Sequence, residues 1–356
     1  MNYAEIAERF AIDGSVERCA RHGNGHINET MLVTAQTGRQ YILQRLNRTV
    51  FPDVPALMRN ISAVTAYLGE RSGDPRRSMH LVPTVTGEQF LLDEAGEYWR
   101  MYDYVTDSIC LESPETAEDF YQSALAFGEF QRTLADFPAE KLTETIPQFH
   151  DTPNRYRQLR EAVERDPLGR LREVQREVDF ALAREEEAGC LMRQLAAGEL
   201  PLRVTHNDTK LNNVLLDAST RKALCVIDLD TVMPGLTAFD FGDSIRFGAA
   251  TAAEDERDLD RMEMSLEMYE TFASGFVSAC GGVLTPAELA SLPLGAKLMT
   301  LECGVRFLTD HLVGDVYFRI HRPGHNLDRC RTQFKLVADM EKKESRMREI
   351  IEGIRA

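Results

Sequence analysis

The pattern of the sequence changes once, near residue 105, and this change constrains the fold more than any other feature. Before it, short β-like runs alternate with turn signals, over 31–34, 41–44, 80–83, 89–93 and 98–104. One helical pattern interrupts these runs at 53–68. After it, long helical patterns recur, over 117–137, 153–165, 170–197, 254–279, 286–313 and 329–354. We therefore expect an α+β protein with a β-rich lobe over 1–105 and a mainly helical lobe over 106–356.

Composition excludes two classes of partner. Lys and Arg number 41 and Asp and Glu 57, so the net charge of −16 argues against nucleic-acid binding, which needs clustered cations. Apolar runs fall far short of the ~20 residues of a membrane-spanning helix, and no signal-peptide pattern follows Met1. The seven cysteines are dispersed, without metal-binding or redox spacing, which fits reduced thiols. We expect a cytoplasmic protein with no nucleic-acid or membrane partner. The sequence does not specify the oligomeric state, and a monomer is slightly favoured.

One segment of the helical part carries the residues typical of phosphoryl transfer. Asp208 is followed five residues later by Asn213, and Asp228 ends a predicted hairpin over 213–228. In such a loop the first carboxylate orients a hydroxyl and accepts its proton. The Asn amide oxygen and the second carboxylate are hard oxygen ligands for Mg²⁺. We assign catalysis to Asp208, and metal binding to Asn213 and Asp228.

Two neighbours of Asp208 are candidates for supporting roles. Lys210 is close enough in sequence to reach the γ-phosphate and offset its charge during transfer, although an ordinary surface lysine is the alternative. His206 fits an orienting residue, packed and hydrogen-bonded within the loop, better than it fits a base.

The order of these motifs resembles the aminoglycoside phosphotransferase and choline kinase family of protein-kinase-like small-molecule kinases. The resemblance covers nearly the whole chain, including a linker near 102–106, the loop over 206–213, Asp228 and the run over 234–243. It implies a bilobal protein-kinase-like fold, with a small antiparallel sheet and one main helix in the N-terminal lobe. It also implies ATP as co-substrate and Mg²⁺ as cofactor.

Within this family, three runs look like those of N-acetylhexosamine 1-kinases, at 25–30, 205–213 and 242–248. This closer resemblance implies transfer of the γ-phosphate of ATP to the anomeric hydroxyl of N-acetylglucosamine or N-acetylgalactosamine. Two alternatives stay open. In the first, the protein is a kinase of the same family whose acceptor is choline, ethanolamine, homoserine or an aminoglycoside. In the second, the protein is a catalytically degenerate nucleotide-binding module.

Two segments are candidates for nucleotide binding. Gly23, Asn24 and Gly25 lie between two predicted strands and permit close approach of backbone to phosphates, although a simple hairpin turn is an equal reading. In the linker, the resemblance implies that Asp103 and Val105 offer backbone groups to adenine.

The third strand departs from the kinase pattern. Kinases place a lysine there against the α- and β-phosphates, whereas alternation puts Gln44 in that inward position and Arg45 outward. A neutral amide donates hydrogen bonds but brings no charge. We therefore expect Gln44 to contact the nucleotide, with Mg²⁺ and Lys210 supplying the positive charge.

An acceptor sugar needs convergent polar groups and an apolar or aromatic wall. Arg306 and Tyr317 are our candidates at the mouth of the cleft, and His26 and Asn28 are candidates to cover the reacting hydroxyl that Asp208 aligns. Arg306 in a core ion pair and Tyr317 in simple packing are the alternatives. His206 and Asp230 are expected to support the site. The resemblance implies that Asp240 is the aspartate that stabilises the fold after the metal-binding loop. Asp243 and Arg246 are expected to form an ion pair that supports this loop.

Overall fold

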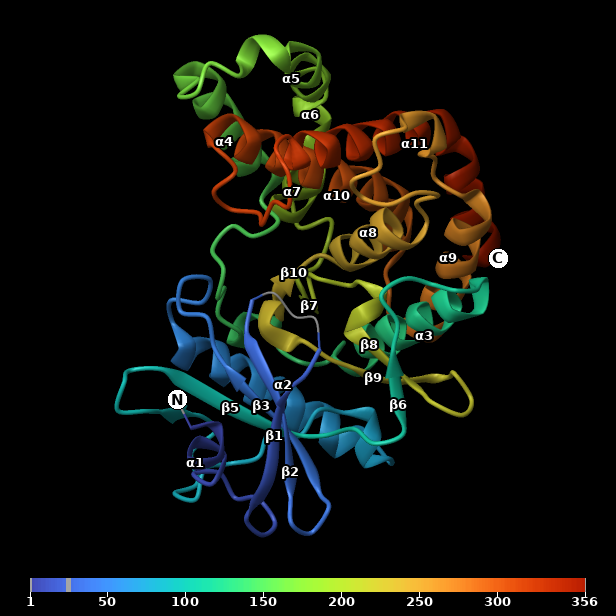
Figure 1. Ribbon diagram of the computed structural model, residues 1–356. Coiled ribbons are helices and arrows are strands. Elements are labelled where there is room, and N and C mark those ends of the chain that lie inside the picture. The colour runs from blue at the N-terminus through green and yellow to red at the C-terminus, as the bar shows by residue number, and fades with distance from the viewer. Residues whose placement is uncertain (1, 24–26, 356) are drawn as a thin grey trace. The chain divides into compact units, whose positions relative to one another are not determined.

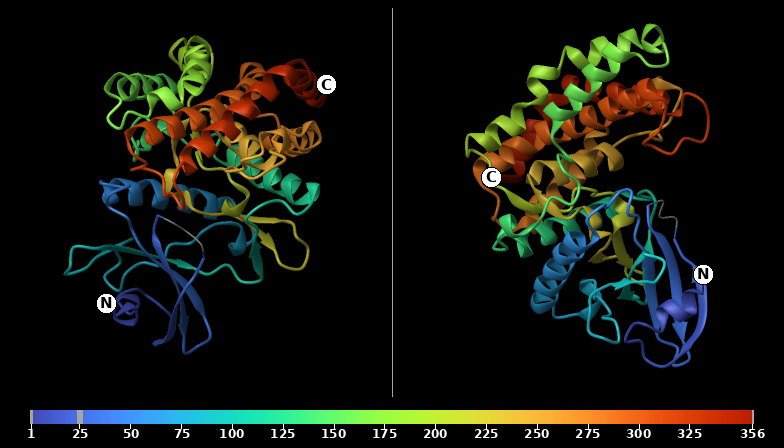
Figure 2. Two further views of the ribbon diagram at one scale, coloured as in Figure 1. Left: turned by 45° about the horizontal axis from the view of Figure 1, so that its top comes forward. Right: turned by 90° about the vertical axis from the view of Figure 1, so that its left-hand side faces the viewer.

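The computed structural model describes residues 2–23 and 27–355 (Figures 1 and 2). The chain forms two compact units. Unit 1 consists of Met1–Ile109, Pro138–Pro147 and Leu215–Met233. Unit 2 consists of Cys110–Phe137, Gln148–Val214 and Pro234–Ala356. The lobe boundary between 105 and 106 stays a prediction.

Unit 1 is built on a five-stranded antiparallel sheet with the strand order β1-β2-β3-β5-β4. Its strands are β1 (Val16–Arg21), β2 (Glu29–Ala35), β3 (Gln40–Arg45), β4 (Leu91–Leu92) and β5 (Tyr98–Asp103). The predicted strand over 80–83 is wrong, because this segment contributes only an isolated bridge from Leu81 to Tyr102. Conversely, the bounds of β1, the strand before Gly23, were not predicted, because it is an edge strand without a buried side chain and lacks the usual alternation.

The two faces of this sheet differ in chemistry. Alternate residues of the central strands, among them Val33, Leu43, Trp99 and Met101, pack with Phe10 in one apolar core. On the opposite face, Thr30 of β2, Gln44 of β3 and Arg100 of β5 lie directly across from one another. The sheet therefore presents a polar row on the face away from its core.

The main helix of unit 1 is α2 (Val54–Arg71), and it begins where Asp53 accepts a hydrogen bond from the Ala56 amide at 2.9 Å. The buried Asn60 side chain donates to the carbonyls of Thr143 and Val232. These bonds connect the three chain segments of unit 1. Unit 1 also contains α1 (Tyr3–Ala7) and the short 3₁₀ turns η1 (Pro75–Arg77), η2 (Ala139–Lys141) and η5 (Leu229–Thr231).

The predicted hairpin is present as β8 (Val214–Asp217) and β9 (Ala223–Val226), joined in a three-stranded sheet by β6 (Ser108–Cys110). Its turn is closed by the Asp217 carboxylate, which accepts from the amides of Ser219 and Thr220 at 3.1 and 2.9 Å. The hairpin thus leads from η4 (Leu211–Asn213) to Asp228.

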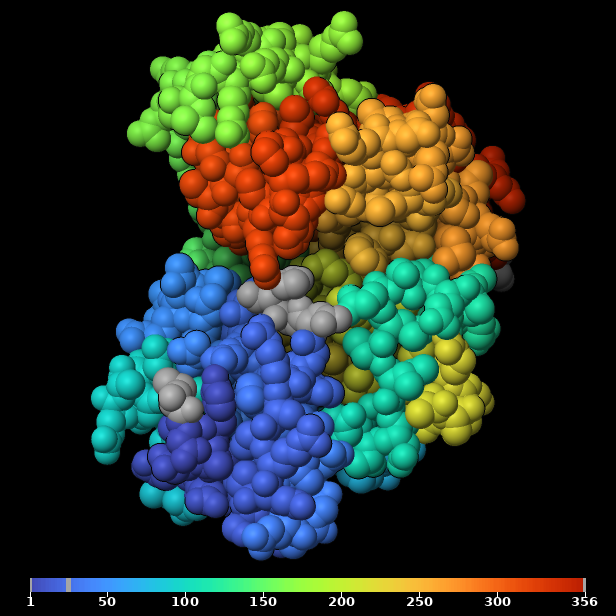
Figure 3. Space-filling model, viewed as in Figure 1, coloured from blue at the N-terminus to red at the C-terminus, as the bar shows by residue number. Residues whose placement is uncertain are grey.

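Unit 2 is mainly helical. Its helices are α3 (Ala117–Thr133), α4 (Thr152–Arg165), α5 (Gln175–Leu182), α6 (Glu185–Ala188), α7 (Cys190–Ala196), α8 (Thr237–Gly248), α9 (Leu266–Cys280), α10 (Pro286–Val313) and α11 (His325–Arg355). The helix α10 packs against α4, α8 and α11, and α3 packs against α9. The orange-red part of the chain between α10 and α11 lies at the surface in Figure 3. Unit 2 also contains η3 (Leu171–Glu173), η6 (Leu259–Arg261) and β7 (Arg203–Thr205), which pairs with β10 (Met233–Gly235).

Two of the predicted helices are shorter than expected. The pattern over 170–197 breaks into η3, α5, α6 and α7, with Gly189 at the junction of α6 and α7. The pattern over 254–279 becomes helical only at Leu266, because Ser265 caps the helix by accepting from the Met268 amide at 3.2 Å. The expected α+β class is nevertheless confirmed. Along the described residues, no helix is both long and apolar enough to span a bilayer.

Candidate active site

The loop over 206–213 is fastened to α8 through its backbone. The Asp240 carboxylate is 1% exposed and accepts from the amides of His206 and Asn207 at 2.9 and 2.8 Å. It also accepts from the Gln131 side chain at 2.7 Å. Because two loop amides share one buried acceptor, the direction of the chain before Asp208 is fixed.

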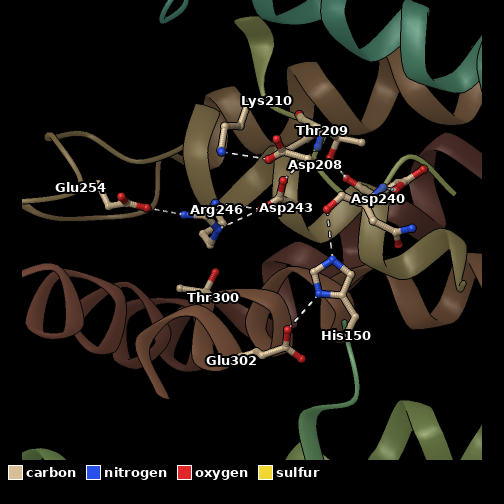
Figure 4. Close-up of polar contacts among 12 residues, drawn as sticks. His150, Asp208, Thr209, Lys210, Asp240, Asp243, Arg246, Glu254, Thr300 and Glu302 are labelled. Atoms are coloured by element: carbon tan, nitrogen blue, oxygen red, sulfur yellow. Dashed lines mark hydrogen bonds and ion pairs between the residues drawn. The ribbon is translucent and has the colours of Figure 1, made fainter. Parts of the chain in front are cut away.

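A second carboxylate of α8 holds the next part of the loop. Asp243 accepts from the Thr209 amide at 2.9 Å and pairs with Arg246 at 2.8 Å. Arg246 continues to Glu254 at 2.7 Å, as Figure 4 shows. The Ser244 hydroxyl donates to the Thr209 carbonyl at 2.8 Å. Asp243 and Arg246 therefore form an ion pair behind the loop.

His206 is fully buried within this arrangement. Its ring meets Phe127 and Phe130 edge-on, with centroids 5.5 and 6.0 Å away. Its Nδ1 accepts from the Asp208 amide at 3.3 Å, which places the proton of a neutral ring on Nε2. The imidazole is thus placed to orient the loop.

Asp208 and Lys210 face each other at the open side of the loop. The Lys210 ammonium lies 2.9 Å from the Asp208 carboxylate, and the side chains are 35% and 30% exposed (Figure 4). Burial raises the pKa of Asp208, but Lys210, with smaller contributions from His206 and Arg246, lowers it more in total, so the pKa lies below the ordinary aspartate value. The charge of Asp208 in turn raises the pKa of Lys210. The pair is therefore ionised at neutral pH.

Asn213 is oriented by the same loop. Its side-chain amide donates to the Asp208 carbonyl at 2.7 Å and to the Asp208 carboxylate at 3.2 Å. Within the described part of the chain, no group donates to its Oδ1. An amide oxygen held in this way suits a hard cation such as Mg²⁺.

Asp228, the other predicted metal ligand, belongs to unit 1. It directly precedes η5 and adopts a left-handed backbone conformation, with φ of 58°. Two residues on, the Asp230 carboxylate accepts from the Arg100 guanidinium and from the Asn28 amide, the latter at 2.5 Å. A carboxylate such as that of Asp228 is a hard oxygen donor, whose chemistry fits Mg²⁺, and its role as a metal ligand stays a prediction.

The nucleotide-binding candidates of unit 1 are described in part. Gly23 has φ of 71°, a conformation that favours glycine, whereas Asn24, Gly25 and His26 lie outside the described residues. Gln44 bonds to two neighbours, accepting from Arg100 at 2.9 Å and donating to Thr30 at 3.1 Å.

The other unit 1 candidates also make internal contacts. Asp103 pairs with Arg39 at 2.8 Å, and the Val105 carbonyl accepts from the Ser108 hydroxyl at 2.7 Å. The amide of Asn28 bonds at both ends, because its oxygen accepts from the Asn47 backbone at 3.0 Å. A contact from Asn28 to substrate stays a prediction.

The acceptor candidates Arg306 and Tyr317 lie together in unit 2. The Arg306 guanidinium lies 5.4, 5.7 and 5.3 Å from the ring centroids of Phe149, Tyr317 and Phe318. Tyr317 is 64% exposed, and its segment is held by Asp310, which accepts from the backbone of residues 316–318. The structure therefore presents a cation beside an exposed aromatic ring.

Sequence reasoning missed a buried pair that contacts the loop over 206–213. Nδ1 of His150 lies 2.9 Å from Glu302, and Nε2 lies 3.1 Å from the Asn207 carbonyl (Figure 4). The Thr152 hydroxyl donates to the other Glu302 oxygen at 2.7 Å. Asn207 itself has φ of 65°, a left-handed conformation that asparagine adopts more readily than most residues, and this bond holds its carbonyl in place. His150 is a single histidine before α4, and no motif with a recognisable spacing includes it, so the sequence did not point to it.

Comparison with known proteins identifies the family. The sequence model of the "Phosphotransferase enzyme family" matches residues 18–273, which is more than half of the chain. The chain belongs to this family. It is therefore a small-molecule phosphotransferase with the predicted protein-kinase-like fold.

Solved structures of low sequence identity share this fold. A microcompartment-associated aminopropanol kinase has a TM-score of 0.59 and 17% identity, over 97% of this chain and 98% of its own. An aminoglycoside phosphotransferase from Alicyclobacillus acidocaldarius has a TM-score of 0.62 and 14% identity, over 98% and 95%. The amicoumacin kinase hAmiN, in complex with AMP-PNP, Ca²⁺ and Ami, has a TM-score of 0.56 and 14% identity, over 98% and 92%.

Proposed function

We propose that this phosphotransferase transfers the γ-phosphate of ATP to the anomeric hydroxyl of N-acetylglucosamine or N-acetylgalactosamine. The main observation that supports phosphoryl transfer is the Asp208–Lys210 pair. The two charged groups lie 2.9 Å apart, on a loop whose amides are fixed by buried carboxylates. A carboxylate that stays ionised can orient a hydroxyl and accept its proton, and fixed geometry is most of what phosphoryl transfer requires. The resemblance of three sequence runs to N-acetylhexosamine 1-kinases supports the choice of acceptor.

Each residue of the site then has a role. Asp208 aligns the anomeric hydroxyl, and Lys210 offsets charge on the transferred phosphoryl group. Asn213 and Asp228 are the proposed Mg²⁺ ligands. When bound, the metal neutralises charge on the β- and γ-phosphates.

For the nucleotide, we retain the sequence-based assignments. Gly23, Asn24 and Gly25 approach the phosphates, and the backbone of Asp103 and Val105 meets adenine. The similar amicoumacin kinase structure holds a nucleotide analogue with a divalent cation, which supports a nucleotide and metal site in this fold.

For the acceptor, Arg306 and Tyr317 provide the chemistry that a neutral sugar needs. A sugar ring has hydroxyls for a guanidinium to contact and an apolar face that packs on an aromatic ring. Asn28 and His26 remain proposed contacts to the reacting end of the sugar.

A second candidate keeps the fold and the mechanism but changes the acceptor to an amino alcohol or an aminoglycoside. The solved structures of an aminopropanol kinase and an aminoglycoside phosphotransferase favour it. The charges near the acceptor candidates are of both signs. Burial and the charge of Arg306 lower the pKa of Arg155, whereas Glu302, Tyr317 and Asp151 raise it, so cations and carboxylates lie near one another there.

The test is coupled ADP release with Mg-ATP across N-acetylglucosamine, N-acetylgalactosamine, glucose, galactose, choline, aminopropanol and kanamycin. Selective turnover of the two N-acetylated sugars supports the proposal, and Asp208→Asn should abolish it. Turnover of a cationic acceptor would establish the second candidate. No turnover with any compound, combined with ATP binding, would favour a nucleotide-binding module without catalysis. A cytoplasmic location and a monomeric state also remain our predictions.

A further inference from the structure

A charged residue lies in the middle of the most buried strand of unit 1. Arg100 is 1% exposed, although its neighbours Trp99 and Met101 belong to the apolar core. Alternation along β5 turns Arg100 to the opposite face of the sheet, where Gln44 is its direct cross-strand partner. Burying a guanidinium is unfavourable unless it is paired and hydrogen-bonded, so the partners of Arg100 indicate its purpose.

These partners form a continuous chain to the metal-binding segment. Arg100 donates through Nε to Gln44 at 2.9 Å, and Gln44 donates to Thr30 at 3.1 Å. Arg100 donates through Nη1 to the Asp230 carboxylate, which also accepts from Asn28 at 2.5 Å. The segment that begins at Asp228 is thereby tied directly to Arg100 of β5 and to Asn28, which precedes β2, and through Arg100 to Gln44 and Thr30.

The Asp228–Asp230 segment concentrates negative charge, so a nearby cation such as Arg100 stabilises it. Asp228 and Asp230 place two carboxylates within three residues, and both act on the same guanidinium. Burial lowers the pKa of Arg100, but Asp230 and, to a smaller extent, Asp228 raise it above its usual range. Asp228 also has φ of 58°, a left-handed conformation that is uncommon outside glycine and that aspartate adopts more readily than most residues.

We propose that Arg100 is a positioning residue that holds the Asp228–Asp230 segment for metal binding, and that it supplies the fixed charge that Gln44 lacks. The proposal rests on the proposed function, because it takes Asp228 to be a metal ligand. Gln44 then has a structural reason to be neutral. A lysine at that position would place a second buried cation directly against Arg100.

The test moves the charge between the two cross-strand partners. The variants are Arg100→Gln, Gln44→Lys and the double variant that carries both, with Arg100→Lys as the conservative change. Arg45→Gln is the matched control, because it removes a cation from the adjacent position of β3, where Arg45 is 38% exposed and pairs with Glu29. The readouts are kcat, the Mg²⁺ concentration for half-maximal rate, and Mn²⁺ affinity in the presence of ADP, measured by electron paramagnetic resonance.

We expect Arg100→Gln to weaken Mn²⁺ affinity and lower kcat by about tenfold or more, the usual scale for groups that orient metal ligands. Arg100→Lys and the double variant should each recover much of the loss, whereas Gln44→Lys alone should lower activity. Arg45→Gln should stay within about twofold of the wild type, because its ion pair is partly exposed to solvent.

The proposal and a simple counter-ion role predict opposite changes in the Mn²⁺ affinity of Arg100→Gln. If Arg100 only balances charge, removing it makes the segment more negative and strengthens Mn²⁺ binding, a result that would overturn the proposal. Loss of thermal stability in Arg100→Gln with unchanged metal affinity would overturn it as well. If Arg100→Gln fails to fold, Mn²⁺ affinity in Arg100→Lys and the double variant decides. Mn²⁺ affinity in the presence of ADP is measured without an acceptor, so it tests the role of Arg100 separately from the choice of acceptor. If the wild-type protein phosphorylated no compound of the acceptor panel, that result would instead count against the proposed function.

Discussion

Two acidic segments, one in each unit, are held in different ways. In unit 2, the loop before and after Asp208 is fixed through the backbone amides of His206, Asn207 and Thr209, which bond to carboxylates on α8. In unit 1, the segment of Asp228 is fixed through side chains, chiefly the buried guanidinium of Arg100.

This difference has a consequence for tolerance to substitution. Backbone amides are present whatever the loop side chains are, so the loop of unit 2 depends on its acceptors in α8. The segment in unit 1 depends on a specific donor, whose loss leaves a buried carboxylate without its charge partner. We therefore expect substitutions in α8 to affect folding, and substitutions around Arg100 to affect metal binding.

The largest expected effect is the loss of turnover when either functional aspartate is replaced. Asp208→Ala removes the proposed proton acceptor, and Asp228→Ala removes a proposed metal ligand, so each should lower kcat by roughly 10³-fold or more. Both variants should unfold at a temperature close to that of the wild type, as measured by circular dichroism. Glu94→Ala, an exposed carboxylate, is the control. Near-normal turnover in either pure variant would contradict the assignment.

The next effect should be on stability and tests the unit 2 half of the comparison. Asp240→Ala leaves two buried loop amides without their acceptor and removes one of the two acceptors of the Gln131 side chain, which should lower the free energy of unfolding by about 3 kcal/mol. Urea denaturation measures this change. The exposed Asp136→Ala should change it by less than about 0.5 kcal/mol. If the two variants were equally stable, the loop would not depend on α8.

A third prediction concerns pH and uses the Asp208–Lys210 pair. The pKa of Asp208 is lowered below its ordinary value, so the base stays ionised and activity is retained as pH falls toward that value. Lys210→Met removes the lowering charge and should move the acidic limb of kcat/KM to higher pH, besides reducing kcat by about tenfold. Lys210→Arg should keep the limb near its wild-type position. An acidic limb that does not move in Lys210→Met would show that Lys210 does not set the charge state of Asp208.

The smallest effects should be in the acceptor region. Arg306→Met should raise KM for the N-acetylated sugar by about tenfold, and Tyr317→Phe by only a few-fold, because the second change keeps the ring. KM for ATP should stay unchanged in both, as initial-rate kinetics with each substrate varied will show. Arg319→Met is the control, since this exposed arginine lies in the same loop, two residues after Tyr317. Equal changes in both KM values would place the two residues outside a dedicated acceptor site.

The sequence predicted those features whose residues lie close together along the chain. The spacing from Asp208 to Asn213, the hairpin after it and the pattern of α2 and α10 lie within continuous runs, and the fold class follows from them. The five-residue interval between Asp208 and Asn213 corresponds to an observed hydrogen bond between their side chains.

Long-range partners were not predictable. Arg100 and Asp230 are 130 residues apart, and His150 and Glu302 are 152 residues apart, so no local pattern connects them. Arg100 did leave one trace, a charge that interrupts an apolar strand, and alternation assigns it to the face of Gln44. Its partner, however, is supplied by tertiary packing alone.

The most direct test of the central claim is the position of the phosphate in the product. The wild-type protein is incubated with Mg-ATP and N-acetylglucosamine or N-acetylgalactosamine, and the product is examined by phosphorus and proton nuclear magnetic resonance. Our account predicts a phosphate coupled to the anomeric proton, formed together with one ADP and absent with Asp208→Ala. A phosphate on another hydroxyl, or no transfer to either sugar under conditions where a different acceptor is phosphorylated, would contradict it.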